Sequence, residues 1–246
     1  PSRSISGRRN IVIGRSEREA SDSLVSIIIP AFNEWVVSCN CIDSVIESVS
    51  NLNVEIILAD DHSTDETRNA SFHYPEIVHC RSDENLGFLR NCNAAAKVAK
   101  GKHLVFLNND TIVHDYWLEA LLDVFESHSD AGIAGSMLLY PDGSLQEAGG
   151  IVWKDGSAWN YGRNQDASAP EYNYLREVDY ISGASIMILK SLWERIGGFD
   201  EQFCPAYYED TDLAFQVREQ GFKVYYTPFS KVDHLEGISH GTDLGG

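Results

Sequence analysis

Carboxylate and amide side chains gather at two places that directly follow apolar stretches of the sequence. Asp60 and Asp61 come after one stretch, and Asn108, Asn109 and Asp110 come after another. A carboxylate at the first place can accept a hydrogen bond from a ribose hydroxyl or from the imide N–H of a uracil-type base. A carboxylate at the second place is a hard oxygen ligand that can bridge a divalent cation to a diphosphate. These residue types indicate a nucleotide site and a metal site.

A third acidic segment has residue types suited to proton transfer. Glu209, Asp210 and Asp212 lie close together, and any of these carboxylates can act as a general base toward a hydroxyl group. The alternative is an acidic helix N-terminus with Asp210 or Thr211 as its cap. His234 can ligate a transition metal as a neutral imidazole, or it can be an ordinary histidine at the end of a strand.

The first two places also have structural explanations. Ser63 and Glu66 match a capping box, in which the serine caps a helix and the glutamate bonds back to it. That interpretation leaves Asp60 unexplained. The segment 108–110 can equally be a turn that leads into the next helix.

Alternating strands and helices must position these groups. Apolar, β-branched runs predict strands at 24–29, 54–59, 77–80 and 103–107. Apolar residues at helical spacing predict helices at 35–49, 61–69, 88–100 and 116–125. Since strands that alternate with helices form βαβ units, the sequence predicts an α/β fold with a mainly parallel sheet.

The loops after the predicted strands are polar. In an open parallel sheet, ligands bind beyond the carboxyl ends of the strands, which here are followed by segments 30–34, 60–65, 81–87 and 108–110. No GxGxxG follows the first strand, and GxxxxGK[ST] does not occur in the sequence. A dinucleotide site of the Rossmann type and a P-loop are therefore not expected.

The second half of the chain has a looser pattern and many aromatic residues. We expect extended segments at 133–140, 144–153, 180–189 and 223–227, with helices at 191–196 and 209–220. The aromatic residues of this half include Trp153, Trp159, Tyr161, Tyr172, Tyr174, Tyr180, Trp193, Tyr207 and Tyr208. Aromatic rings can stack on the C–H faces of sugars, so they suit a carbohydrate surface. Core packing is the alternative for any one of them.

Composition excludes several classes of protein. The 246 residues include 37 acidic and 19 basic ones, a formal net charge of −18, which argues against nucleic-acid binding. Hydrophobic residues at 43% are typical of a chain with a folded core. Five cysteines without a CxxC pair favour a reducing, cytoplasmic setting. No apolar run approaches the roughly 20 residues that span a bilayer.

The chain divides into a domain with two flanking segments. Residues 1–23 are rich in Ser and Arg and are expected to be a linker or arm, and 241–246 form a tail. The domain, 24–240, is expected to have a nucleotide-sugar half at 24–110 and an acceptor and catalytic half at 111–240. Both ends look cut, which indicates a piece of a longer protein with further domains.

A series of short motifs in one order resembles glycosyltransferase family 2. They are Val25–Glu34, Ile57–Thr67, Asn85–Phe88, Phe106–Thr111, Ser182–Ala184, Gly197–Glu201 and Glu209–Leu213. The resemblance covers roughly residues 24–240 and implies a GT-A fold, with a Rossmann-like, mainly parallel sheet flanked by helices and a smaller mixed region on the acceptor side. It also implies inverting transfer from a nucleotide-diphosphate sugar. The chain is most similar to bacterial rhamnosyl- or galactosyltransferases of O-antigen and other surface polysaccharides.

The resemblance assigns roles to residues of this sequence. The positions that match nucleotide-binding residues are Pro30, Phe32, Asn33, Glu34, Asp60, Asp61, Asn85, Gly87, Asn108 and Asn109. Asp210 matches the catalytic base, with Glu209 beside it to contact the acceptor. Asp110 and His234 match the metal ligands. The positions expected to contact the donor or acceptor sugar are Gly150, Trp153, Ser182 and Gly183.

The metal motif departs from the family pattern, which is usually Asp-x-Asp. Its first position here is Asn108, which leaves Asp110 as the one carboxylate. Because imidazole beside carboxylate suits Mn²⁺ better than Mg²⁺, the expected cofactor is a divalent metal, with Mn²⁺ preferred.

The implied partners are a UDP- or dTDP-sugar and a glycan or lipid-linked acceptor. The protein is expected in the cytoplasm, either free or peripheral at the inner face of the plasma membrane. A sugar- or nucleotide-binding domain without activity is a first alternative, which the loss of the carboxylate at Asn108 keeps open. A sugar nucleotidyltransferase is a second, although 30–34 is neither basic nor rich in glycine.

Overall fold

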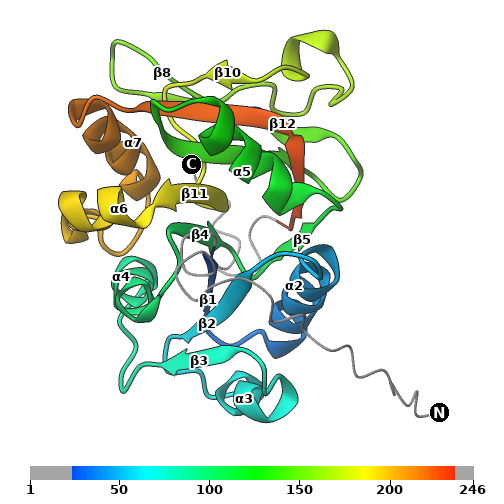
Figure 1. Cartoon of the computed structure of the whole chain (residues 1–246), viewed down its shortest axis with the longest axis vertical. Coiled ribbons are helices and arrows are strands. Elements are labelled where there is room, and N and C mark those ends of the chain that lie inside the picture. The colour runs from blue at the N-terminus through cyan, green and yellow to red at the C-terminus, as the bar shows by residue number, and fades with distance from the viewer. Residues whose placement is uncertain (1–23, 236–246) are drawn as a thin grey trace.

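A curled sheet of ten strands runs through the part of the chain that the computed structural model describes, residues 24–235 (Figure 1). The predicted arm at 1–23 and the predicted tail at 241–246 lie outside the described residues. The strands of this sheet are β1 (Val25–Ala31), β2 (Val54–Asp60), β3 (Val78–Arg81), β4 (His103–Leu107), β5 (Thr111–Val113), β6 (Ala131–Leu139), β7 (Leu145–Glu147), β10 (Arg176–Glu177), β11 (Ser185–Leu189) and β12 (Lys223–His234). A separate hairpin pairs β8 (Gly150–Val152) with β9 (Ala158–Asn160).

The sheet is parallel at one end and mixed at the other. Its main path is β10-β12-β6-β11-β4-β1-β2-β3. The pairs among β4, β1, β2 and β3 are parallel, as is the β12–β6 pair, while β11 lies antiparallel between β4 and β6. The same sheet therefore continues through both halves of the domain that the sequence suggested. The α/β architecture with a mainly parallel sheet is confirmed.

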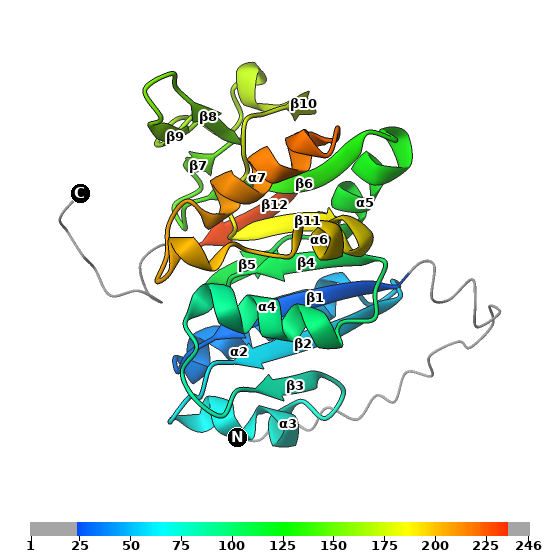
Figure 2. The same ribbon diagram turned by 90° about the vertical axis from the view of Figure 1, so that its left-hand side faces the viewer.

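Helices cover both faces of this sheet. They are α2 (Trp35–Ser48), α3 (Ala70–His73), α4 (Phe88–Val98), α5 (Trp117–Ser127), α6 (Lys190–Ile196) and α7 (Glu209–Glu219), with 3₁₀ turns η1 (Glu66–Asn69), η2 (Pro170–Tyr172) and η3 (Glu201–Phe203). Figure 1 shows α4, α6 and α7 on one side of the strands and α2 and α5 on the other. Figure 2 shows the β8–β9 hairpin at the end of the molecule opposite α3, with β7 of the main sheet close to it.

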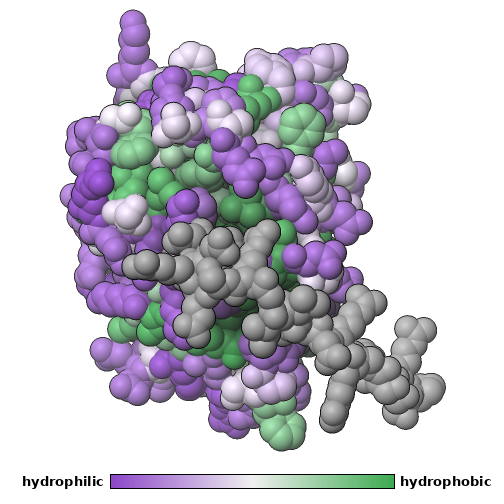
Figure 3. Space-filling model, in the orientation of Figure 1, coloured by the Kyte–Doolittle hydropathy of each residue, from purple (hydrophilic) through white to green (hydrophobic). Residues whose placement is uncertain are grey.

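Alternation of side chains along the strands divides the core into two layers. Ile28 of β1 and Ile57 of β2 pack in the cluster that includes α4, α6 and α7. Ile27 and Ile29 of β1 pack in the other cluster, with α2 and α5. Because successive side chains of a strand point to opposite faces, an unbroken apolar run is what a strand with helices on both faces requires. On the outer surface, hydrophilic residues dominate the rim of the view in Figure 3.

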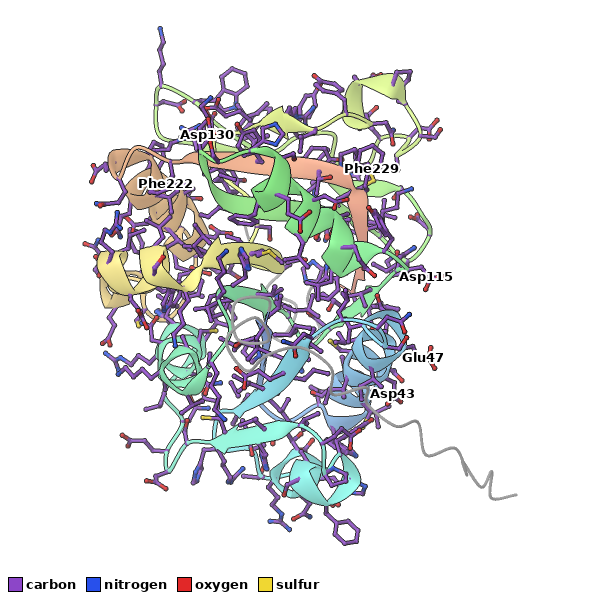
Figure 4. All side chains as sticks on the ribbon, in the orientation of Figure 1. Asp43, Glu47, Asp115, Asp130, Phe222 and Phe229 are labelled. Atoms are coloured by element: carbon purple, nitrogen blue, oxygen red, sulfur yellow. The ribbon has the colours of Figure 1, made fainter. Side chains whose placement is uncertain are left out.

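Strand β12 bends because it contains a bulge. Its first part pairs with β6, and the register shifts between Thr227 and Lys231, where Pro228 and the exposed Phe229 lie. Figure 4 labels Phe229 at this bend. Proline has no N–H to donate, so an irregular position suits it. After the bulge the strand pairs with β5, which carries His234 to the edge of the site.

Several local predictions differ from the structure. Strands β5, β9 and β10 were not expected, and β12 extends to His234 rather than ending at Thr227. The capping box was wrong: Asp65, not Ser63, accepts the hydrogen bond from the Thr67 amide, and Glu66 bonds to His73 instead. Local sequence does not reveal these contacts because Ser63 is held by a different loop.

None of the helices among residues 24–235 is long and apolar enough to cross a membrane.

Candidate active site

The loops that follow β1 and β2 are joined by hydrogen bonds. Ser63 Oγ accepts from the Asn33 amide at 2.8 Å, and the Asn33 side-chain oxygen accepts from the Thr64 amide at 2.8 Å. Asp65 Oδ2 accepts from the Trp35 amide at 2.9 Å, which satisfies one of the free N–H groups at the start of α2. Asn33 and Glu34 both have a φ of 57°, a left-handed conformation that the paired loops hold in place. These hydrogen bonds hold the two loops of the predicted nucleotide site in fixed positions relative to each other.

Asp60, at the end of β2, is fully buried and surrounded by donors. Its carboxylate accepts from the Ser63 amide at 2.8 Å, from His79 Nε2 at 3.1 Å and from the Arg81 guanidinium. Arg81 is its register partner on β3, so the parallel pairing itself brings the two side chains together. Burial acts to raise the pKa of Asp60, but the hydrogen bonds from His79, Ser63 and Arg81 outweigh it and hold the pKa well below its usual range. Asp60 is therefore an ionised group that anchors Arg81 at the edge of the site.

Asp61 connects the loop after β2 to the start of α4. Its Oδ1 accepts from the Leu86 amide at 2.7 Å and its Oδ2 from the Gly87 amide at 2.9 Å. Gly87 has a φ of 78°, which favours glycine, although a Cβ there would meet no neighbouring atom. The two adjacent aspartates thus organise two different loops around one end of the sheet.

The remaining predicted nucleotide residues vary in exposure. Phe32, Glu34 and Asn85 are exposed, and Pro30 is buried at the end of β1. Asn108 is partly buried, and its backbone N–H donates to the Ala184 carbonyl at 3.0 Å.

Asn109 is buried and donates to Ser38 Oγ of α2 at 2.9 Å. That contact ties the 108–110 segment to the helix that begins beside the first loop.

The β5–β12 pairing brings Asp110 and His234 together. His234 is the register partner of Thr111, and the Leu235 amide donates to the Asp110 carbonyl at 2.9 Å. His234 Nε2 lies 3.3 Å from Asp110 Oδ1, and His234 Nδ1 lies 2.9 Å from Gln146 Oε1. An amide oxygen on Nδ1 requires the proton there, which leaves Nε2 facing the carboxylate. An imidazole held in this way is oriented as a metal-binding histidine usually is.

The donor set at this point fits a metal held jointly with a substrate. Asp110 and His234 supply one carboxylate and one imidazole, and no group of three or more His, Cys, Asp or Glu side chains suited to a metal occurs among residues 24–235. Two protein ligands leave coordination positions for diphosphate oxygens and water, as at many nucleotide sites. The residues therefore suit a shared cation rather than a closed structural metal site.

Asp210 occupies the first turn of α7 and faces the loop before β11. Its Oδ2 accepts from the Gly183 amide at 3.0 Å, and its Oδ1 accepts from the Thr211 amide at 2.6 Å. Burial raises the pKa of Asp210 although these hydrogen bonds oppose the rise. Neither Asp210 nor Thr211 is the cap of α7, because the helix begins at Glu209, after Tyr208 in a left-handed conformation.

Asp210 lines a cavity of about 270 Å³, whose other lining residues are Glu147, Ala158, Asn160, Tyr180, Ser182, Tyr207, Tyr208 and Thr211. Tyr207 and Tyr208 have φ angles of 83° and 72°, a strained conformation for bulky residues. Glu209 is not part of this lining, and burial raises the pKa of its carboxyl group. The structure thus separates the two acidic residues that the sequence placed together.

Of the four predicted sugar residues, Ser182 alone is part of the lining of this cavity. Gly183 holds Asp210. Gly150 packs under Tyr180: a Cβ on it would lie 1.9 Å from the ring, so only glycine fits. Trp153 is half exposed and packs edge-on against Trp159 at 5.9 Å between ring centroids, on the β8–β9 hairpin.

Sequence reasoning missed Glu147, Asn160 and Arg81 as site residues. Glu147 is completely buried and lines the same cavity as Asp210, and its only sequence signal is a carboxylate shortly before Gly149 and Gly150. Arg81 was recognised only as part of a polar loop. The pairing of β3 with β2 brings Arg81 to Asp60, and Glu147 meets Ser182 and Asp210 from later segments of the chain.

Two solved structures share this fold. GalNAc-T7 in complex with UDP, GalNAc and Mn²⁺ superposes with a TM-score of 0.74, at 16% identity, over 91% of this chain and 45% of that one. The mannosyltransferase PcManGT from Pyrobaculum calidifontis, in complex with GDP-Man and Mn²⁺, gives a TM-score of 0.63 at 18% identity, over 88% of this chain and 58% of that one. The described domain therefore has the GT-A fold of glycosyltransferases, as the resemblance implied.

The family model for glycosyl transferase family 2 matches residues 26–195, and the chain belongs to that family. It is 29% identical to the O-antigen biosynthesis protein RfbC of Myxococcus xanthus, over 89% of this chain and 18% of the relative. It is 28% identical to the N-acetylglucosaminyl-diphospho-decaprenol L-rhamnosyltransferase of Mycobacterium tuberculosis, over 77% of this chain and 69% of the relative. It is 26% identical to the O-antigen chain rhamnosyltransferase WbaN of Salmonella anatum, over 85% of this chain and 65% of the relative. The chain thus spans less than a fifth of the length of RfbC and about two thirds of the two rhamnosyltransferases.

Proposed function

We propose that this chain is an inverting, metal-dependent glycosyltransferase. It moves a sugar, such as rhamnose or another hexose, from a UDP- or dTDP-sugar to a hydroxyl group of a glycan or glycolipid during surface-polysaccharide synthesis. The observation that carries the proposal is Asp210, a partly buried carboxylate in the wall of a cavity in a family 2 chain. The names of the mycobacterial and Salmonella relatives support rhamnosyl transfer in particular.

Asp210 is the proposed general base. In its ionised form it takes the proton of the acceptor hydroxyl, and the Gly183 and Thr211 amides hold the carboxylate in place. The acceptor oxygen forms a bond to the anomeric carbon as the bond from that carbon to the diphosphate oxygen breaks. Attack opposite the leaving group inverts the configuration. Because burial raises the pKa of Asp210, its ionised fraction falls as the pH is lowered, and activity falls with it.

Asp110 and His234 are the proposed ligands of a divalent cation, which when bound would neutralise charge on the departing diphosphate. Gln146 orients the His234 ring by accepting from Nδ1. The Mn²⁺ in the two solved GT-A structures supports a divalent metal here, and the imidazole ligand favours Mn²⁺ over Mg²⁺.

The nucleotide is proposed to bind across the loops after β1, β2 and β4. Asp60 and Asp61 are proposed to be nucleotide-binding residues here. Asp60 acts together with the Arg81 guanidinium that it anchors. The exposed Phe32 ring lies on the first of these loops and offers a face for the base.

A cytoplasmic location is proposed because all five cysteines are unpaired thiols, as is usual in a reducing compartment.

Nucleotide release is the measurement that tests this function. The protein is incubated with UDP-glucose, UDP-galactose or dTDP-L-rhamnose, with Mn²⁺ and with or without a panel of p-nitrophenyl glycosides as acceptors. We expect release of UDP or dTDP that rises with an acceptor and is lost in Asp210→Asn. Binding of a nucleotide sugar without any release would favour a binding domain, the alternative that Asn108 supports. No binding of any donor would refute the proposal.

A further inference from the structure

Glu147 is a buried carboxyl group in the wall of the Asp210 cavity for which the proposed mechanism has no use. It lies on β7, is 0% exposed, and is part of the cavity lining. Its Oε1 accepts from the Ser182 amide at 3.0 Å, whereas its Oε2 has no hydrogen-bond partner among residues 24–235. Buried polar atoms in proteins nearly always have a partner, so a single unpartnered oxygen at a cavity wall indicates a ligand group.

Glu147 and Asp210 hold neighbouring amides of one loop. The Ser182 amide donates to Glu147 and the Gly183 amide donates to Asp210, so two carboxyl groups from β7 and α7 converge on the same two residues. This arrangement fixes Glu147 relative to the proposed base. Both residues line the same cavity, so a ligand bound at Asp210 lies close to Glu147.

The groups around Glu147 determine its state. Desolvation raises the pKa of Glu147 to about 8, and the negative charge of Asp210 adds to the rise. Tyr180 and Tyr226 are the other titratable groups near it, and burial raises the pKa of both phenols, so neither is charged near neutral pH. Glu147 forms no ion pair within residues 24–235, so with a pKa of about 8 it is largely a neutral carboxylic acid at neutral pH. Such a group can donate one hydrogen bond as well as accept, which suits a hydroxyl.

The rest of the wall has the composition of a sugar site. Asn160 and the phenol of Tyr180 are polar, and Tyr180 Oη donates to Asn160 Oδ1 at 3.0 Å. The exposed rings of Tyr207 and Tyr208 complete the wall. A cavity of about 270 Å³ is close to the lower end of the range for small-molecule sites and has room for a single sugar ring.

We propose that Glu147 is a sugar-recognising residue, whose Oε2 forms a hydrogen bond with a hydroxyl of the carbohydrate unit that occupies the Asp210 cavity. The inference rests on the proposed glycosyltransferase function and adds a specificity residue to it. The hydroxyl belongs either to the donor sugar or to the acceptor, and the experiment has one arm for each.

The test compares the variants Glu147→Gln and Glu147→Met with the unchanged protein. Glutamine keeps an acceptor for the Ser182 amide and a donor for the ligand, whereas methionine keeps the volume and removes both. Glu119→Met is the matched control, because Glu119 on α5 also has a buried oxygen without a partner but lies outside the cavity. If Glu147→Met does not fold, Glu147→Asp, which withdraws the carboxyl by one methylene, takes its place with the same expected result.

The donor arm measures the Kd of UDP against UDP-glucose and UDP-galactose, and of dTDP against dTDP-L-rhamnose. The acceptor arm measures KM for the p-nitrophenyl glycosides. We expect Glu147→Met to lose about tenfold or more, roughly what one buried hydrogen bond to a ligand contributes, in one arm. In the donor arm, the loss would be a weaker Kd for the nucleotide sugar relative to the nucleotide alone. In the acceptor arm, it would be a higher KM for the glycoside. Glu147→Gln stays within about threefold of the unchanged protein, and UDP and dTDP alone bind equally to every variant.

Two results would overturn the inference. In one, Glu147→Met leaves both arms unchanged. In the other, it weakens UDP or dTDP alone by the same factor as the nucleotide sugar, which would make Glu147 only a support for the Ser182 loop. If the unchanged protein binds neither nucleotides nor nucleotide sugars, the proposed function itself fails, a result distinct from both.

Discussion

The buried Glu147 makes a specific prediction about stability against pH. Its pKa is about 8 in the folded protein, against an ordinary value of 4.5 in the unfolded chain. Between these values the folded state holds a proton that the unfolded state has released. Folding is therefore favoured at the lower end of the range, and stability is lost as the pH rises toward the folded pKa.

The size of the effect follows from the slope of about 1.4 kcal/mol per pH unit that one proton gives. From about pH 5.5 to about pH 7.5, Glu147 alone lowers the free energy of unfolding by roughly 2–3 kcal/mol. In a domain of this size that corresponds to a fall in Tm of about 5–10 °C.

The assay is thermal and urea unfolding at several pH values and constant ionic strength. Glu147→Gln carries no titrating proton, so its stability should depend on pH less steeply by this amount. The Asp210 carboxyl, whose pKa burial also raises, remains in both proteins, so the difference between them isolates Glu147. Glu126→Gln, at an exposed position of α5, should keep the full pH dependence and is the control. Equal pH slopes for the unchanged protein and Glu147→Gln would show that Glu147 is already ionised in the folded state, and the reasoning from its burial would be refuted.

Three further predictions concern the proposed chemistry. Asp210→Asn should lower kcat by about 10²–10⁴, the usual contribution of a general base, with nucleotide affinity nearly unchanged; if Asp212→Asn caused that loss instead, the base would be Asp212. Excess EDTA should abolish activity and Mn²⁺ should restore it more fully than Mg²⁺, whereas full turnover in EDTA would exclude a role for Asp110 as a metal ligand. Asp60→Ala should weaken UDP or dTDP binding by about tenfold or more, roughly 1.4 kcal/mol, as measured by calorimetry. An unchanged Kd in a folded Asp60→Ala variant would remove that residue from the nucleotide site.

Exposed acidic residues also lie on the surface, away from the carboxylates of the candidate site. Asp43, Glu47 and Asp115 are acidic residues on or near α2 and α5, and Figure 4 shows them at the outer edge of the molecule. The net charge of −18 therefore includes exposed carboxylates outside the candidate site. The buried Asp60 and the partly buried Asp210 are instead held by specific amides and side chains.

The sequence by itself determined the class of fold and most of its strands and helices. The apolar runs before Pro30 and Asp60 predict buried strands because a strand with helices on both faces has no polar side, and β1 and β2 agree to within a residue or two. The order of the motifs indicated the family, and the polar segments after the strands predicted at which end of the sheet the site should lie. Each of these features lies within a short stretch of the chain, so the sequence alone is enough to recognise it.

Only the tertiary structure decided how the acidic residues are used. Asp60 and Asp61 turned out to hold Arg81 and the Gly87 loop, contacts that depend on which strand lies beside which. His234 reaches Asp110 because a bulge bends β12 onto β5, far away in the sequence. Glu147 pairs locally with Leu138 of β6, whereas its neighbours Ser182 and Asp210 come from distant segments of the chain. Burial and the pKa of a carboxyl group depend on neighbours from distant segments, and residue types in a short window do not specify those neighbours.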